Sequence, residues 1–205
     1  MSARQSSGLE DMAVAELVER ARQGDRDAFE QLVNEYKDKI YNYVARMLND
    51  RDRAEDVAQE TFIRAYTSLP NFRGASSFQT WLYRIASNLA IDTMRRRSYR
   101  EGEFSLDETL QTREGEVQRQ VEDEGPGPEK TIQNEELRAQ IEEAIVELSP
   151  KLRTVIVLYE MQGLSYKEIA KVVGAPLGTI KSRLFNAREQ LKEILEEKLD
   201  MPLTG

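Results

Sequence analysis

Apolar residues recur every three or four positions through the first hundred residues, which is the period of amphipathic α-helices. No segment shows a convincing alternation with a period of two, so strands are not expected. The pattern predicts a helix before residue 49, a second over 54–68 and a third over 77–97, with a turn at 69–74 between the last two. Their apolar stripes are Phe29, Leu32, Val33, Tyr36, Ile40, Val44, Met47 and Leu48, then Ala54, Val57, Ala58, Phe62, Ala65 and Leu69, then Phe78, Trp81, Leu82, Ile85, Ala86 and Leu89.

The third of these helices has a predicted start signal. Ser76 and Gln79 have the residue types and the spacing of a capping box. In such a box each side chain hydrogen-bonds the backbone N–H of the other residue, and this marks the first turn of a helix.

The last seventy residues repeat the helical period in shorter pieces. A helix ends at 149–150, where proline opens the next helix, and Gly163 ends that one. Ser165 and Glu168 form a capping-box pattern for a short helix, and a tight turn at 174–176 leads into a longer final helix. A short helix, a glycine turn and a longer helix together predict a helix-turn-helix.

The charge pattern separates the two helical blocks. The net charge is −8, but residues 101–136 hold twelve acidic and three basic residues, so the rest of the chain sums to +1. This stretch contains Gly-Pro-Gly-Pro and few apolar residues, and it therefore predicts a flexible acidic linker. We expect an all-α protein with a disordered leader at 1–9 and two small helical domains at 10–100 and 137–199.

Composition excludes several function classes. The chain has no cysteine and no histidine, which removes disulfides, thiol catalysis, thiolate metal sites and the commonest general base. No apolar stretch reaches the roughly 20 residues that span a bilayer, and no secretory signal is recognisable at the N-terminus. We therefore expect a cytoplasmic protein that is not an enzyme and has no metal or cofactor.

The exposed side of the final helix carries side chains suited to duplex DNA. A recognition helix contacts base edges through its N-terminal residues, and Arg, Lys, Asn and apolar rings each match particular bases. The alternative is a solvated helix face with one aromatic side chain packed locally, and the capped helix and glycine turn before it favour DNA. The candidate residues are Thr179, Lys181, Ser182, Arg183, Phe185, Asn186 and Arg188.

A second set of candidates surrounds the turn at 69–74 and the outer side of the following helix. Aromatic, arginine and amide groups around a short loop suit unstacked single-stranded bases. The alternative is structural, because Phe78 and Trp81 lie on the apolar stripe and the basic run at 95–97 can complement a helix dipole. The candidate residues are Asn71, Phe72, Arg73, Gly74, Ser76, Ser77, Arg84, Asn88 and Arg95.

The outer face of the predicted 54–68 helix is mostly acidic with one exposed isoleucine. Such a face can dock on a basic helical partner, although a merely solvated face is the more common outcome. The candidate residues are Glu55, Asp56, Gln59, Glu60, Ile63 and Arg64.

Three segments in this order resemble the extracytoplasmic-function sigma factors of bacterial RNA polymerase. They are DRAEDVAQETFIRAY (52–66), LPNFRGASSFQTWLYRIASN (69–88) and LSYKEIAKVVGAPLGTIKSRLFNAR (164–188). The likeness covers about three quarters of the chain. Two features depart from the family pattern: Asn186 stands where arginine is expected, and the linker is long.

The resemblance implies a role for each candidate set. The 54–68 face would bind the clamp helices of the largest subunit of core RNA polymerase, and the C-terminal domain would meet the flap of the second-largest subunit. The second set would capture non-template bases of the promoter −10 element, and the final helix would enter the major groove of the −35 element. An anti-sigma factor, often membrane-anchored, would hold the protein inactive, and no small-molecule substrate is implied.

Three other functions are compatible with parts of the pattern. A sigma-like decoy that sequesters a regulator need not keep DNA-binding side chains, and here both basic surfaces are present. An ordinary helix-turn-helix repressor or activator would bind duplex DNA without polymerase and would have no use for the loop at 71–78. Catalysis by paired carboxylates is the least favoured, since such pairs lie only on an exposed helix or in the linker.

Overall fold

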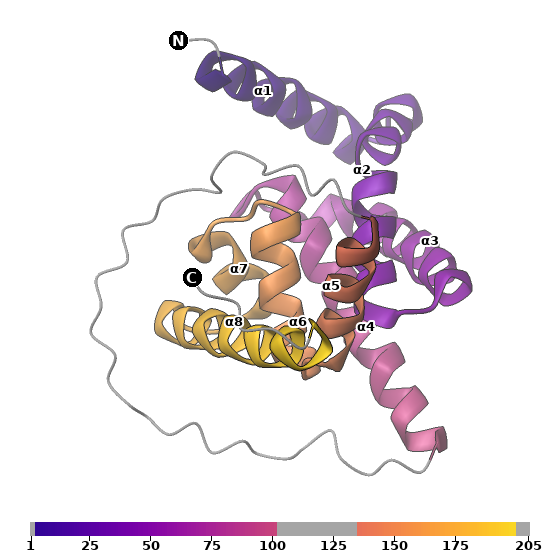
Figure 1. The fold of residues 1–205 in the computed structure, drawn as a ribbon. Coiled ribbons are helices and arrows are strands. Elements are labelled where there is room, and N and C mark those ends of the chain that lie inside the picture. Colours follow the sequence, from indigo (N-terminus) through magenta and orange to yellow (C-terminus); the bar gives the residue numbers. More distant parts are fainter. Residues whose placement is uncertain (1–2, 102–134, 200–205) are drawn as a thin grey trace.

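The computed structural model describes the backbone of residues 3–101 and 135–199, and the side chains of 13–99 and 139–199. Every regular element in these residues is helical, which confirms the predicted all-α fold class (Figure 1). Nearly all of the predicted linker lies outside the described residues.

The N-terminal group of helices is built around α2. It consists of α1 (Ala3–Arg22), α2 (Arg26–Leu48), α3 (Arg51–Ser68), the short 3-10 helix η1 (Leu69–Asn71) and α4 (Phe78–Glu101). Helix α1 begins at Ala3, within the segment 1–9 that was expected to be a leader. The side chains of that segment lie outside the described residues. The predicted break between the second and third helices is present as η1 and the loop after it.

The C-terminal group follows the predicted order of helices. It consists of α5 (Glu135–Glu147), α6 (Pro150–Ile156), the π-helical segment η2 (Val157–Met161), α7 (Tyr166–Val173) and α8 (Leu177–Leu199). The capping box of Ser165 and Glu168 is confirmed, with the Ser165 N–H donating to Glu168 Oε2 at 2.9 Å. Gly174 ends α7 with a φ of 69°, a left-handed conformation that glycine adopts without steric cost.

Two tyrosines that the apolar stripes omit lie at the centre of the N-terminal group. Tyr43 and Tyr83 are buried, and their rings meet edge to face with centroids 5.3 Å apart. The Tyr43 hydroxyl shares a 2.7 Å hydrogen bond with Ser87 Oγ, so its polar end is satisfied inside the core. Burial raises the pKa of both tyrosines, and both stay neutral at physiological pH.

The two groups of helices pack against each other. Helix α7 lies against α4, and α5 and α6 lie against α2, so that the C-terminal helices sit directly on the N-terminal group in Figure 1. Buried apolar side chains of both groups belong to one continuous cluster. The chain therefore folds as a single closed body over its described residues, an arrangement that the helical period could not predict.

Candidate nucleic-acid interface

The N-terminal half of α8 presents the predicted duplex-binding side chains. Lys181, Ser182, Phe185 and Arg188 are exposed, while the other three candidates, Thr179, Arg183 and Asn186, are half-buried. The opposite side of the helix is held in the core by Ile180, Leu184 and Ala187. Phe185 keeps 54% of its surface exposed, so it is available for contact rather than packed locally. The structure thus brings all seven candidates to the first half of one helix.

Arg188 differs from the other members of this set because it already has a partner. Its Nε and Nη2 atoms donate to Glu160 Oε1 at 3.1 and 2.7 Å, and its guanidinium lies 5.2 Å from the centre of the Tyr159 ring. Burial alone would lower the pKa of Arg188, but the hydrogen bonds and charge of Glu160 outweigh it and raise the pKa. The residue is therefore oriented by its own domain, and only part of its charge is free for phosphate.

The loop between η1 and α4 holds an aromatic cluster at its base. Phe72 is half-buried, with its ring centroid 4.9 Å from that of Trp81 and 6.4 Å from that of Phe78. Asn71, Arg73 and Gly74 are exposed around it. Gly74 has a φ of 68°, so the tight path of the loop favours glycine there. This cluster confirms the structural role of Phe78 and Trp81 and places Phe72 at the edge of the core.

The helix start at α4 corrects one prediction. Ser77, not Ser76, caps the helix: its Oγ accepts from the Thr80 N–H at 3.2 Å and hydrogen-bonds Thr80 Oγ1 at 2.8 Å. The predicted pair of Ser76 and Gln79 was one residue early, because a Ser-Ser dipeptide offers two equivalent caps to sequence reasoning. Part of the hydrogen-bonding capacity of Ser77 is therefore used within the protein.

Helix α4 carries the remaining candidates for single-stranded DNA on one exposed face. Arg84, Asn88 and Arg95 are all exposed, and their separations of four and seven residues keep them on one side of the helix. Ile91, 38% exposed, lies between Asn88 and Arg95 on the same side. The loop and this face together supply polar, cationic and aromatic groups from adjoining segments of the chain.

The third surface is the outer face of α3. Glu55, Asp56, Gln59 and Arg64 are exposed, Glu60 is half-buried, and Ile63 is 59% exposed. Arg64 Nε donates to Glu60 Oε1 at 2.7 Å, so these two charges neutralise each other. The net negative charge of the face therefore comes from Glu55 and Asp56.

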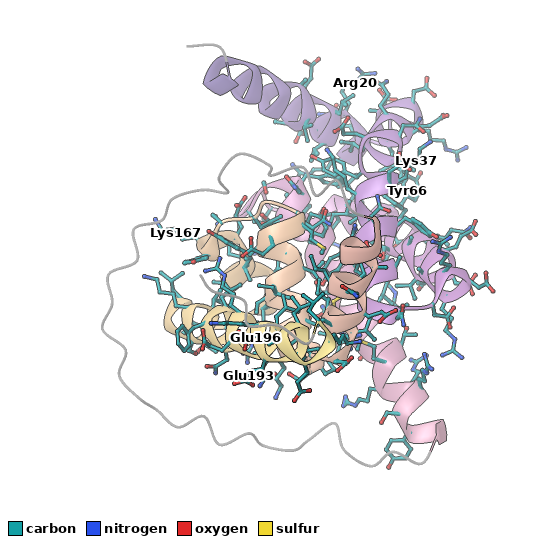
Figure 2. All side chains as sticks on the ribbon, in the orientation of Figure 1. Arg20, Lys37, Tyr66, Lys167, Glu193 and Glu196 are labelled. Carbon is teal, nitrogen blue, oxygen red and sulfur yellow. The ribbon has the colours of Figure 1, made fainter. Side chains whose placement is uncertain are left out.

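One exposed side chain on α3 was missed by sequence reasoning. Tyr66 is 44% exposed and lies three residues after Ile63, so the two form a small apolar strip beside the acidic residues. Its ring meets Phe29 of α2 edge to face, with centroids 4.9 Å apart. The three-residue spacing between Ile63 and Tyr66 could have predicted that both side chains lie on the same side of the helix. Figure 2 shows Tyr66 on the same side of the molecule as Lys37 of α2.

Two further findings bear on the expected functions. Among the described residues, no group of three or more acidic, histidine or cysteine side chains is placed to hold a metal ion. No described helix is both long and apolar enough to cross a membrane.

Both groups of helices match known protein families. The description "Sigma-70 region 2" matches residues 32–100, and "Sigma-70, region 4" matches residues 138–191. The chain is 41% identical to the RNA polymerase sigma-H factor of Pseudomonas aeruginosa over 186 residues, 90% of this chain and 94% of that protein. This chain belongs to the sigma-70 family, as an extracytoplasmic-function sigma factor. It is therefore a sigma factor that directs transcription initiation.

Other relatives agree with this assignment. The sigma factor SigW of Bacillus subtilis is 39% identical over 188 residues, 91% of this chain and 99% of that protein. The structure of CnrH with the cytosolic domain of CnrY has a TM-score of 0.66 at 24% identity, covering 90% of this chain, and it supports the fold alone. The structure of the sigma factor RpoE with the anti-sigma factor NepR from Bartonella quintana has a TM-score of 0.62 at 25% identity, covering 82% of this chain.

Proposed function

We propose that this sigma factor uses three separate surfaces to bring core RNA polymerase to a promoter. Residues 10–100 form the domain for polymerase and the −10 element, and residues 137–199 form the domain for the −35 element and the polymerase flap. The acidic segment 101–136 connects them. Neither domain is assigned a catalytic role, since the family regulates transcription.

The outer face of α3 is proposed to bind the clamp helices of the polymerase. Its support is the combination of the exposed acidic side chains Glu55 and Asp56 with the exposed apolar strip of Ile63 and Tyr66. Charge complementarity accelerates association and fixes orientation, while apolar burial supplies affinity. Glu60 and Arg64 neutralise each other, so they contribute shape more than net charge.

The loop after η1 and the exposed face of α4 are proposed to capture unstacked bases of the −10 element. Phe72 supports this because part of its ring is accessible beside a rigid aromatic cluster. Single-stranded bases stack on such rings, and amide groups such as that of Asn88 hydrogen-bond exposed base edges. Arg84 and Arg95 flank Asn88 and can neutralise neighbouring phosphates.

The N-terminal half of α8 is proposed to enter the major groove of the −35 element. One observation carries the whole proposal. The residues that match sigma-70 region 4 include a capped helix-turn-helix, and its second helix exposes Lys181 and Phe185. Helices of this kind place their first turns against base edges. Lys181 can contact guanine or phosphate, and Phe185 can contact a thymine methyl.

An anti-sigma factor is the proposed regulator. Two solved structures with a similar fold are complexes, CnrH with the cytosolic domain of CnrY and RpoE with the anti-sigma factor NepR. Because core polymerase and promoters are cytoplasmic, we place the protein in the cytoplasm.

The test is run-off transcription on fragmented genomic DNA by purified core polymerase, with and without this protein. New discrete transcripts that share two upstream elements are the expected result. Absence of both transcripts and core binding would instead favour a decoy or an ordinary helix-turn-helix regulator. A variant with Glu55→Lys and Asp56→Lys should lose core binding and transcription together, whereas Glu35→Lys on α2 should retain both.

A further inference from the structure

Asn186 lies at the edge of the exposed face of α8. It is half-buried, and its neighbours toward the core, Leu184 and Ala187, are almost fully buried. Ser182, four residues earlier, is exposed, so the side chains of Ser182 and Asn186 share one face of the helix. Asn186 therefore projects from a helix that is held in place by the core, and not from a loop, which favours a precise contact with a ligand.

Two other polar side chains of the proposed −35 surface already have partners within the protein. Ser182 Oγ donates to the carbonyl oxygen of Thr179 at 3.1 Å, and Arg188 donates to Glu160. The side-chain amide of Asn186, by contrast, makes no hydrogen bond to another residue in the part of the chain that the structure describes. It therefore keeps its whole hydrogen-bonding capacity for a ligand.

The Asn186 amide holds a donor and an acceptor in one plane, and this arrangement distinguishes among the four bases. In the major groove adenine presents the N7 acceptor beside the N6 amino donor, so asparagine makes two hydrogen bonds to it. Guanine presents two acceptors there, and the amide oxygen would meet one of them without a proton. Cytosine presents a donor alone, and thymine presents one acceptor beside its methyl group. Adenine is thus the base that satisfies both polar atoms of Asn186.

The charge along α8 indicates which part of the helix approaches DNA. Residues 177–188 contain three basic residues and no acidic residue, a charge of +3. Residues 189–199 contain four acidic and two basic residues, a charge of −2, and Figure 2 shows Glu193 and Glu196 of this second half. Because phosphates attract the basic half and repel the acidic one, we expect the DNA contact to end with the basic half, whose last turn holds Asn186.

The spacing along α8 lets Asn186 contact the same short element as Lys181 and Phe185. Lys181 and Asn186 are five positions apart, which is a rise of ~7.5 Å along the helix. This rise corresponds to about two steps of ~3.4 Å between stacked base pairs. The three side chains therefore reach bases of one upstream element when the helix lies along the groove.

We propose that Asn186 is a specificity-determining residue that reads one adenine of the −35 element. The amide nitrogen donates to adenine N7, and the amide oxygen accepts from the N6 amino group. This inference rests on the proposed function, because it assumes that α8 enters the major groove of that element. Phosphate contacts by basic side chains hold the helix on any sequence, whereas the Asn186 contact adds a preference for one base.

The test is a selection of duplexes by the whole protein bound to core RNA polymerase. A promoter found by run-off transcription is randomised over its upstream element, and the bound DNA is sequenced. The proteins compared are the unchanged chain, Asn186→Ala, Asn186→Arg and Gln190→Ala. Gln190 is the matched control because it is also a half-buried amide, one turn further along α8 and beyond the basic half.

We expect the unchanged protein to select adenine at one position that Asn186→Ala no longer discriminates. Affinity of Asn186→Ala for the adenine-bearing duplex should fall about tenfold, within the range of a specific base contact. Asn186→Arg should select guanine at this position, because a guanidinium donates to both O6 and N7. Gln190→Ala should select the same sequences as the unchanged protein. Retained selection at the other positions shows that each variant is folded.

An altered base tests the contact at a single atom. Replacing the selected adenine with 7-deazaadenine removes the N7 acceptor but keeps the N6 amino group and the pairing with thymine. Loss of one hydrogen bond of ordinary net strength should lower the affinity of the unchanged protein about fivefold. The affinity of Asn186→Ala should be the same for both bases, because its partner for N7 is already missing.

Three results would overturn the proposal. The first is selection by Asn186→Ala of the same sequences as Gln190→Ala, and the second is selection by the unchanged protein of a base other than adenine at the position that Asn186→Ala alters. The third is an equal effect of 7-deazaadenine on the unchanged protein and on Asn186→Ala. Failure of the polymerase complex to select any upstream element would instead contradict the proposed function, and this inference would fall with it. The two failures are therefore distinguishable.

Discussion

The two proposed DNA-binding surfaces are built in opposite ways. The −35 surface lies on one helix, α8, and its side chains are positioned by the core residues on the other side of that helix. The −10 surface combines a loop with a helix face and depends on the aromatic cluster of Phe72, Phe78 and Trp81. It also lies next to the other domain, through the contact of Lys171 with Ala75.

This difference shows which of the two DNA-binding surfaces depends on the other domain. A helix that carries its own recognition residues positions them through the core residues on its opposite side. A loop whose backbone is bound by another domain depends on that domain for part of its surroundings. We therefore expect substitutions in the −10 surface to affect promoter opening strongly, and substitutions on α8 to change duplex affinity by smaller, salt-dependent factors.

The largest effect is expected from Phe72→Ala. It removes the accessible ring on which a base can stack, and stacking on an aromatic side chain contributes about 1–3 kcal/mol per base. Promoter opening, measured by the fluorescence of 2-aminopurine placed in the −10 element, should fall by about 10- to 100-fold while core binding is unchanged. Phe72→Tyr keeps the ring and should retain opening, so equal defects in both variants would contradict a stacking role.

A smaller effect is expected from Asn88→Ala. Loss of a base-edge hydrogen bond should weaken binding of a single-stranded −10 oligonucleotide by about tenfold, within the 1–3 kcal/mol typical of specific base contacts. Asn34→Ala is the control, because Asn34 is an exposed asparagine of α2 that accepts from Lys37 at 3.3 Å. Equal affinity of the Asn88 and Asn34 variants would remove this face of α4 from the −10 surface.

Lys181→Ala tests the proposed −35 surface on α8. Affinity for a duplex −35 element should fall a few-fold, and the slope of log affinity against log salt should decrease by about one if the ammonium contacts a phosphate. Lys192→Ala, a charge change near the other end of the same helix, should leave the slope unchanged. An unaltered affinity of the Lys181 variant at moderate salt would contradict groove placement.

The smallest effect is expected from Arg188→Ala. Because its guanidinium is already bound to Glu160 and lies against Tyr159, it has less charge to offer than Lys181. Duplex affinity should fall less than for Lys181→Ala at the same salt concentration, and Glu160→Gln should increase it slightly by releasing the arginine. A larger loss from Arg188→Ala would show that Glu160 positions the arginine on DNA rather than withholding it.

Local patterns predicted much of the architecture and part of the site. The capped helix-turn-helix was predictable because Ser165, Glu168 and Gly174 act within a few residues of chain. The cap of α4 was misplaced by one residue because Ser76 and Ser77 are chemically identical. The buried pair Tyr43 and Tyr83 was missed, since a tyrosine can lie on either side of an amphipathic helix until its hydroxyl partner is known.

The sequence by itself determined the all-α class, the order of the helices and the family, because helical period, caps and short motifs are local properties of the chain. Only the tertiary structure decided that the two groups of helices close on each other, that Arg153 bridges the ends of α2 and α5, and that Glu160 holds Arg188. These contacts join residues as many as 106 positions apart. Their partners are chosen by packing geometry, and no periodicity along the chain encodes such a pairing.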